Sequence, residues 1–248
     1  RGGQEPQKQE PQKRADAPAK AAKVRKAAPQ RSRPQGGNKP PAKKQATRSF
    51  PGLDAPRLLA HDVLTRVRED EAYANLILPR LLRERRIVDR DAAFTTEITY
   101  GTLRAKGVLD AVIAESSTRP LDKIAPEVLD ALRLGAYQLL YTRVEPHAAV
   151  DTTVRLVEAS GNEHAKGFAN AVMRTITRTP ADKWIDILTP PGEIAAVAFR
   201  NAHPTWIAES FSRVLGLGEL DAALDADSER PTVHLVARPG ELTAEELA

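Results

Sequence analysis

The chain has 248 residues, no cysteine, and a formal net charge of +4 from 37 basic and 33 acidic residues. The absence of thiols excludes disulfides, thiolate metal sites and a cysteine nucleophile within this chain. Its longest stretch without a charged residue is nine residues, Leu134–Thr142, far short of the roughly 20 apolar residues of a transmembrane helix. No apolar signal segment follows the N-terminus. We therefore expect a cytoplasmic protein with no membrane partner.

The charge is unevenly distributed along the chain. Residues 1–49 hold 14 basic and 3 acidic residues and lack aromatic residues, leucine and isoleucine. Such a segment cannot bury enough apolar surface to fold, so we expect a disordered basic tail. Its spaced cations suit non-specific attraction to phosphates, although a solubilising or vector-derived tail would look the same. Residues 50–180 are balanced, and residues 181–248 hold 12 acidic and 5 basic residues.

Residues 53–178 show helical periodicity from end to end. Leu59, Val63 and Val67 recur at i, i+4 and i+8 after a capping Asp54. Similar apolar stripes follow, separated by prolines, glycines and capping residues. The pattern predicts an all-α bundle of about seven helices over residues 50–180.

Several helix boundaries can be predicted within this region. A helix over residues 72–86 should break or kink at Pro79. Asp89 or Asp91 should cap the next helix, which should end at Gly107.

The helix expected over Pro126–Tyr141 is apolar around nearly its whole circumference, which is typical of the centre of a bundle. Arg133 interrupts its apolar surface and should find a carboxylate or carbonyl, because an unpaired buried guanidinium is costly. A structural role is the main interpretation of Arg133, and an RNA contact is the alternative.

Beyond Thr179 we expect a linker and three short helices, followed by the first strand, Thr232–Ala237. Thr243 and Glu246 have the spacing of a capping box at a further helix start. A strand and one helical turn predict the truncated start of an α+β module over residues 181–248, so we expect the chain to be a fragment.

No catalytic constellation is visible in the sequence. The five histidines lack the spacing of zinc ligands, and Gly216 and Gly218 form only a Gly-x-Gly without a third glycine. We expect no catalytic residue, metal or cofactor site in this fragment.

Basic residues are the best candidates for binding. Lys166, Asn170, Arg174 and Arg178 recur every four residues, so they should line one helix face without an acid among them. Such a face can follow a phosphate backbone and reach a base edge. An ordinary solvated face is the alternative interpretation.

Two further basic clusters lie at expected helix ends. The first contains Arg83, Arg85 and Arg86, with Arg90 close behind, and the second contains Arg104 and Lys106. RNA binding is one interpretation. The other is a favourable interaction with the helix dipole, worth about 0.3–1 kcal/mol.

Several of these stretches match a known family in order and spacing. Residues 90–104, 131–140, 147–151 and 166–174 resemble the NusB-like domain, in the variant found at the N-terminus of ribosomal RNA small-subunit methyltransferase B (the RsmB, Sun or Fmu family). The segment His203-Pro-Thr-Trp206 resembles a His-Pro-x-Trp segment of the same family. The resemblance covers about residues 55–248.

The resemblance implies an S-adenosylmethionine-dependent enzyme that methylates C5 of a cytosine in small-subunit ribosomal RNA. Such enzymes use two cysteines, and this chain has none. We therefore expect the RNA-binding half, which binds ribosomal RNA and methylates nothing alone. The acidic residues 181–248 should pack on the missing C-terminal catalytic domain.

Two alternatives remain open from the sequence. A free-standing NusB-like antitermination factor would bind leader RNA and a ribosomal protein. A helical protein–protein adaptor would not need the Lys166–Arg178 face for RNA.

Overall fold

The computed structural model describes residues 50–229, 240–241 and 243–247. The expected basic tail over 1–49 and the expected strand over 232–237 lie outside these residues. The elements, in chain order, are α1 Ala55–Glu69, α2 Ala74–Arg85, α3 Asp89–Arg104, α4 Lys106–Ser116, η1 Leu121–Lys123, α5 Pro126–Tyr141, α6 Pro146–Ala159, η2 Glu163–Ala165, α7 Lys166–Ile176, α8 Ala181–Leu188, α9 Glu193–Arg200, α10 Thr205–Leu215, α11 Leu217–Ser228 and α12 Ala244–Leu247.

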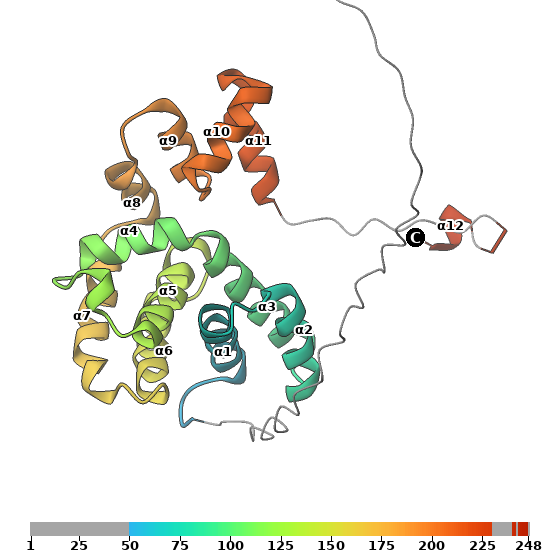
Figure 1. Ribbon diagram of the computed structural model, residues 1–248. Coiled ribbons are helices and arrows are strands. Elements are labelled where there is room, and N and C mark those ends of the chain that lie inside the picture. The colour runs from blue at the N-terminus through green and yellow to red at the C-terminus, as the bar shows by residue number, and fades with distance from the viewer. Residues whose placement is uncertain (1–49, 230–239, 242, 248) are drawn as a thin grey trace, which may run out of the picture. The chain divides into compact units, whose positions relative to one another are not determined.

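The prediction of an all-α bundle is confirmed, with α1–α7 forming its body (Figure 1). Helix starts follow the expected chemistry. The Asp54 side chain accepts a hydrogen bond of 2.9 Å from the backbone N–H of Arg57, and prolines occupy the first turns of α1, α5 and α6. No helix among the described residues is long and apolar enough to cross a membrane.

Two predicted boundaries are wrong, and the helix does not break at Pro79. Pro79 lies inside a continuous α2, because Leu78 and Leu81 are buried in a cluster with α1 and hold the helix on both sides of the proline. Neither Asp89 nor Asp91 is the N-cap of α3; both lie in its first turn, where a negative charge suits the helix dipole. The boundary between α3 and α4 falls at Ala105, and Gly107 lies inside α4.

Helix α5 is the centre of the bundle, as its apolar circumference predicted. It packs against α1, α3, α4, α6 and α7. Its residues Leu132, Leu134 and Ala136 are fully buried. The main core is built around this helix, while a smaller cluster joins α1 and α2.

Two glycines allow close helix crossings around α5. A Cβ at Gly135 would lie 2.1 Å from Thr153 Oγ1 of α6 and 2.7 Å from Met173 Cε of α7. A Cβ at Gly101 of α3 would lie 2.0 Å from the Tyr137 hydroxyl. The helices at both crossings approach more closely than a methyl group allows.

A chain of ion pairs links α1, α4 and α5. Arg133 binds both carboxylate oxygens of Asp110, at 2.6 and 2.9 Å, and one oxygen of the buried Asp130 at 3.1 Å. The other Asp130 oxygen accepts a hydrogen bond of 2.9 Å from Arg68. The predicted carboxylate partner of Arg133 is thus confirmed, and its geometry fits a structural role.

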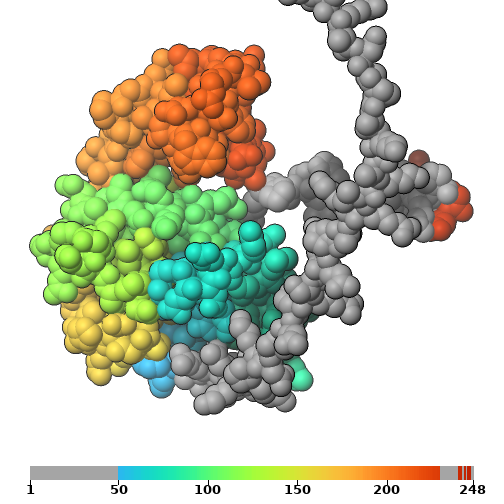
Figure 2. All heavy atoms as spheres, in the orientation of Figure 1, coloured from blue at the N-terminus to red at the C-terminus, as the bar shows by residue number. Residues whose placement is uncertain are grey.

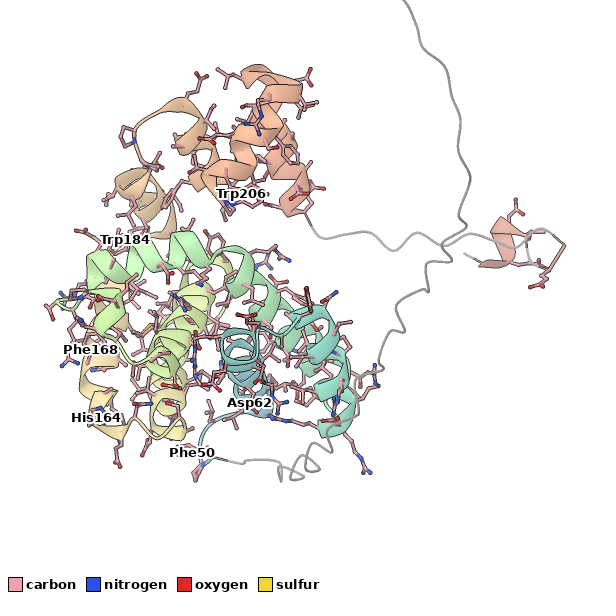
Figure 3. The ribbon with its side chains drawn as sticks, viewed as in Figure 1. Phe50, Asp62, His164, Phe168, Trp184 and Trp206 are labelled. Atoms are coloured by element: carbon pink, nitrogen blue, oxygen red, sulfur yellow. The ribbon has the colours of Figure 1, made fainter. Side chains whose placement is uncertain are left out.

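The expectation of a linker directly after Thr179 is wrong over residues 181–188, which form α8 and continue the packing of the bundle. The Trp184 side chain belongs to the main core, and its indole N–H donates a hydrogen bond of 3.1 Å to the carbonyl of Ile176 at the end of α7 (Figure 3). Helices α9, α10 and α11 form a separate small core. They match the three short helices predicted there, and Thr243 and Glu246 form the predicted capping box.

The His-Pro-x-Trp segment divides into a structural part and an exposed part. His203 Nδ1 contacts the Asn201 carbonyl at 2.7 Å, and Nε2 lies 3.0 Å from a carboxylate oxygen of Asp227 in α11. Trp206 is instead 68% exposed. The His203 imidazole therefore ties α11 to the start of α10, whereas the Trp206 indole lies largely in solvent.

Candidate nucleic-acid interface

Helix α7 presents one apolar and one polar face. Ala169, Val172, Met173 and Ile176 are buried in the main core. Asn170 is half-buried and Arg174 exposed on the other side of the helix. The sequence periodicity thus placed these two predicted residues on the correct face.

Asn170 and Arg174 face a groove of about 490 Å³ between α6 and α7. Helix α6 contributes its N-terminal half to this groove, including His147 and Asp151, and α7 contributes its C-terminal half. The residues that line it are Pro146, His147, Val150, Asp151, Val154, Asn170, Arg174 and Thr177. The groove therefore combines apolar walls with an amide, an imidazole, a carboxylate and a guanidinium.

The groove contains one guanidinium that is not paired with a carboxylate. Arg174 has no ion-pair partner among the described residues. The one carboxylate in the groove, Asp151, already accepts a hydrogen bond of 2.7 Å from Arg155. The start of α6 lies at the same groove, and its N-cap residue Glu145 is exposed and offsets the positive end of the helix dipole. The unpaired guanidinium of Arg174 is therefore the group in the groove that can bind an anion.

Lys166 differs from what its position along α7 predicted. Its ammonium lies 3.2 Å from Glu158 of α6 and 3.4 Å from Glu163 of η2. The hydrogen bond to Glu158 is the main cause that raises the pKa of Lys166. The expectation of an acid-free face is therefore wrong at Lys166, because neighbouring elements supply carboxylates that lie off the helix itself.

Arg178 also departs from the predicted stripe. Helix α7 ends at Ile176, so Arg178 lies exposed in the turn that follows. It has no ion-pair partner in the described part of the chain. Its charge lies after the last turn of α7, where it also suits the helix dipole.

The cluster at the end of α2 splits into inward and outward arginines. Arg85 forms an ion pair with Asp62 of α1 and is only 13% exposed. It therefore ties α2 to α1 and is not free to bind phosphate. The prediction that Arg85 contributes to RNA binding is wrong for this reason. Arg83 and Arg86 are exposed and have no partner among the described residues.

Arg104 and Lys106 flank the turn between α3 and α4, and both are exposed. The positive charge of Arg104 acts on Tyr137, whose hydroxyl donates a hydrogen bond of 2.7 Å to Glu97. Burial and the nearby Glu97 nevertheless raise the pKa of Tyr137 far above its ordinary value. Arg104 thus has a local electrostatic role, and the structure gives Lys106 no ion pair within the described ranges.

Sequence reasoning missed three residues near α7. His147 and Thr177 line the groove. Arg119 lies 4.8 Å from the ring centroid of Phe168, in a cation–π geometry. Thr177 follows Arg174 by three residues and could have been found from helical periodicity. His147 and Arg119 come from the start of another helix and from a loop, so no periodicity connects them with Asn170 and Arg174.

The family model described as "NusB family" matches residues 54–178, from the N-cap of α1 to just beyond α7. The chain belongs to the NusB family. The NusB-like bundle expected from the sequence motifs is thereby confirmed, and it carries the α6–α7 groove.

Curated relatives of this NusB-family chain are longer proteins. It is 51% identical over 201 residues to "Putative methyltransferase Rv1407" of Mycobacterium tuberculosis, covering 79% of this chain and 44% of that protein. It is 28% identical over 161 residues to "Probable ribosomal RNA small subunit methyltransferase B" of Bacillus subtilis, covering 64% of this chain and 35% of that protein. The chain thus spans less than half the length of these relatives.

A solved structure titled "Crystal Structure of PH0851" superposes with a TM-score of 0.56 at 15% identity. The match covers 75% of this chain and 40% of that one. At this identity the similarity shows the fold alone.

Proposed function

We propose that the NusB-like bundle is the RNA-binding part of an S-adenosylmethionine-dependent methyltransferase that acts on small-subunit ribosomal RNA. Family membership over residues 54–178 and the names of the relatives support the methyltransferase assignment. The α6–α7 groove supports the RNA-binding assignment. In this proposal the substrate position is C5 of a cytosine, as in the family that the sequence resembles.

The unpartnered guanidinium of Arg174 beside Asn170 is the observation that carries the RNA assignment. A cation without a carboxylate partner can bind a phosphate without first breaking an ion pair. The amide of Asn170, one turn away on α7, offers both a donor and an acceptor for a base edge. Together they give the groove a positioning contact and a specifying contact.

The described residues contain no recognisable binding motif for S-adenosylmethionine. The pair Gly216 and Gly218 lies at the junction of α10 and α11 and gives no glycine-rich loop for a nucleotide. We therefore assign none of the described residues to S-adenosylmethionine or to the transfer of its methyl group.

The catalytic domain of the same polypeptide is the second partner in this proposal. Residues 181–229 are acidic, so phosphate would be repelled from α8–α11. We assign this segment to packing against the catalytic domain, while α7 faces the RNA.

RNA binding can be tested by titrating labelled small-subunit RNA fragments, followed by fluorescence anisotropy at two salt concentrations. Arg174→Glu with Arg178→Glu should weaken binding at least about tenfold and reduce its salt dependence. Lys166→Glu should have a smaller effect, because Lys166 is already paired. The matched control is Lys183→Glu, an exposed charge reversal on α8. Equal affinities for the parent and the double variant would remove the groove from the mechanism.

The methyltransferase assignment has a separate test in the full-length protein. Arg174→Glu should raise the KM for small-subunit RNA and leave kcat nearly unchanged, because the contact positions substrate and is remote from the chemistry. Absence of label transfer from S-adenosylmethionine to small-subunit RNA by the parent would defeat this assignment.

A further inference from the structure

The outward face of α2 carries large apolar side chains that the bundle does not use. Tyr73, at the N-cap, is 74% exposed, and Leu76, three residues later on the same face, is 68% exposed. The Tyr73 backbone is fixed, because its carbonyl accepts hydrogen bonds of 3.0 and 3.1 Å from the N–H groups of Leu76 and Ile77. A rigid backbone thus holds an aromatic ring in solvent.

The buried side of α2 explains why this face stays free. Leu78 and Leu81 pack in the cluster with Leu59 and Val63 of α1. Arg85 adds its ion pair to Asp62 on the same side. Helix α2 packs mainly against α1 and α3, and it lies at the outside of the bundle (Figure 2). The opposite stripe therefore has no intramolecular partner among the described residues.

The same stripe continues as a row of guanidinium groups. Arg80 and Arg83 follow Tyr73 and Leu76 at helical spacing, and Arg86 is the C-cap. Arg80 is 71% exposed and lies 2.6 Å from Glu84, whereas Arg83 and Arg86 have no ion-pair partner within the described residues. Glu84 is the only acid between Tyr73 and Arg86. The stripe is thus apolar and aromatic at its start and cationic along the rest.

Acidic side chains limit the stripe at both ends. Asp70 and Glu71 precede Tyr73, and Asp89 and Asp91 follow Arg86. The helical part of this surface, from Tyr73 to Arg83, is about 15 Å long by helix geometry, and Arg86 follows at the C-cap. A short run of nucleotides fits that length better than an extended duplex groove.

We propose that Tyr73, Leu76, Arg80, Arg83 and Arg86 form a track for single-stranded RNA, distinct from the α6–α7 groove. One base stacks on the Tyr73 ring and covers Leu76, and the phosphates that follow bind Arg83 and Arg86. An aromatic platform combined with a line of cations is the chemistry that binds single strands with little sequence preference. This inference rests on the proposed function and adds that the bound RNA has an unpaired segment.

RNA fits this surface better than a protein does. Two guanidiniums without partners offer charge complementarity to a polyanion. A protein partner would instead have to bring a carboxylate to each, and it would need a larger apolar patch than Tyr73 and Leu76 provide. A protein partner is an outcome of the test below.

The probe for the test is a fluorescein-labelled oligouridylate of 12 nucleotides, titrated against the full chain and followed by anisotropy. Tyr73→Ala should weaken binding at least about fivefold, the lower limit for loss of one base stack, and Tyr73→Trp should restore it. Arg83→Gln with Arg86→Gln should reduce the slope of log K against log salt by about 1.4. All of these side chains are exposed, and circular dichroism checks that the variants fold.

Two controls separate this track from the groove. Lys183→Glu, an exposed charge reversal on α8, should leave oligouridylate affinity unchanged, and Arg174→Glu should weaken binding of structured ribosomal RNA more than binding of oligouridylate. A 12-base-pair duplex should bind Tyr73→Ala and the parent equally, because paired bases cannot stack on the ring. If Arg174→Glu has no effect on any RNA but Tyr73→Ala weakens oligouridylate binding, the groove assignment fails and the track stands.

Three results would overturn the track. One is an oligouridylate affinity that Tyr73→Ala does not change. Another is an equal loss of duplex and single-strand binding in Tyr73→Ala. The third is a parent that does not bind oligouridylate but self-associates or captures a protein in a Tyr73-dependent way, which would make the stripe a protein interface.

Discussion

Single residues decide how closely the helices of this bundle approach. Gly135 lies where α5 crosses α6 and α7, and Gly101 lies where α3 meets Tyr137. At both positions the missing methyl group is a packing requirement, because both lie within helices where glycine is otherwise unfavourable.

Gly135→Ala should destabilise the protein by about 1–2 kcal/mol. Alanine gains about 0.5–1 kcal/mol in helix propensity, but the clash with Thr153 and Met173 costs about 1–3 kcal/mol or more. Urea denaturation measures the difference. Gly167→Ala in α7 is the matched control, since a Cβ there meets nothing within 4 Å. It should be neutral or stabilising, and a stable Gly135→Ala variant would mean that the crossing is wider than described.

Tyr137 should make the stability of the protein depend on alkaline pH. Burial, and then the hydrogen bond to Glu97, raise the pKa of its phenol above the ordinary value of 10.0. Because the folded pKa exceeds the unfolded one, the contribution of Tyr137 to stability is complete below pH 10 and declines as pH rises above it. Unfolding free energies between pH about 9 and about 11 should therefore fall less steeply in Tyr137→Phe than in the parent. Tyr73→Phe, a change to an exposed ring, is the control; equal slopes for Tyr137→Phe and the parent would contradict the assignment.

At the scale of elements, periodicity predicts helices well and their partners poorly. The apolar stripe of α7 placed Asn170 and Arg174 correctly, because both lie on the helix that carries the stripe. It could not show that Glu158 and Glu163 neutralise Lys166, since those acids come from α6 and η2. The Arg85–Asp62 pair joins α2 to α1 and was equally invisible in the sequence of α2.

Helix boundaries failed where packing overrides local preference. Pro79 carries no N–H and should break a helix by itself, but the buried leucines on either side hold α2 together. The α6–α7 groove could not be predicted at all, because it needs the approach of His147 to the far end of another helix. A local sequence pattern predicts which face of a helix is buried. Which residues of other helices contact the opposite face is known only from the tertiary structure.

The two tryptophans should report separately on α8 and α10. Trp184 is 5% exposed and hydrogen-bonded, whereas Trp206 is 68% exposed on the other helix. Trp206→Phe should shift the fluorescence emission to shorter wavelength and nearly remove quenching by iodide. Trp184→Phe should leave an emission that is red-shifted and easily quenched. An iodide-protected Trp206 in this chain would mean that its indole is covered.

At the scale of the whole molecule, charge is separated along the chain. Residues 1–49 hold 14 of the 37 basic residues, and the segment after residue 180 is acidic. This separation suits a protein that attracts RNA with its N-terminal part and keeps its C-terminal part away from phosphates.

Removal of residues 1–49 should weaken RNA binding and flatten its salt dependence. Each phosphate that the tail no longer neutralises should change the slope of log K against log salt by about 0.7–0.9. Affinities of the parent and the shortened chain at several salt concentrations give this slope. The thermal midpoint should not change if the tail adds nothing to the folded core. An unchanged slope of log K against log salt would mean that residues 1–49 do not contribute to RNA binding.

The indole of Trp184 caps the last turn of α7 from outside the segment by which the family is recognised. Proteolysis within residues 179–181 would strip this cap, leave the Ile176 carbonyl without its donor and open the core beside α7 to water. Cleavage within residues 189–192 would leave both the hydrogen bond to Ile176 and the core beside α7 intact. The cooperative unit of unfolding is therefore longer than the segment that defines the NusB family, and limited digestion should reveal its edge after Leu188.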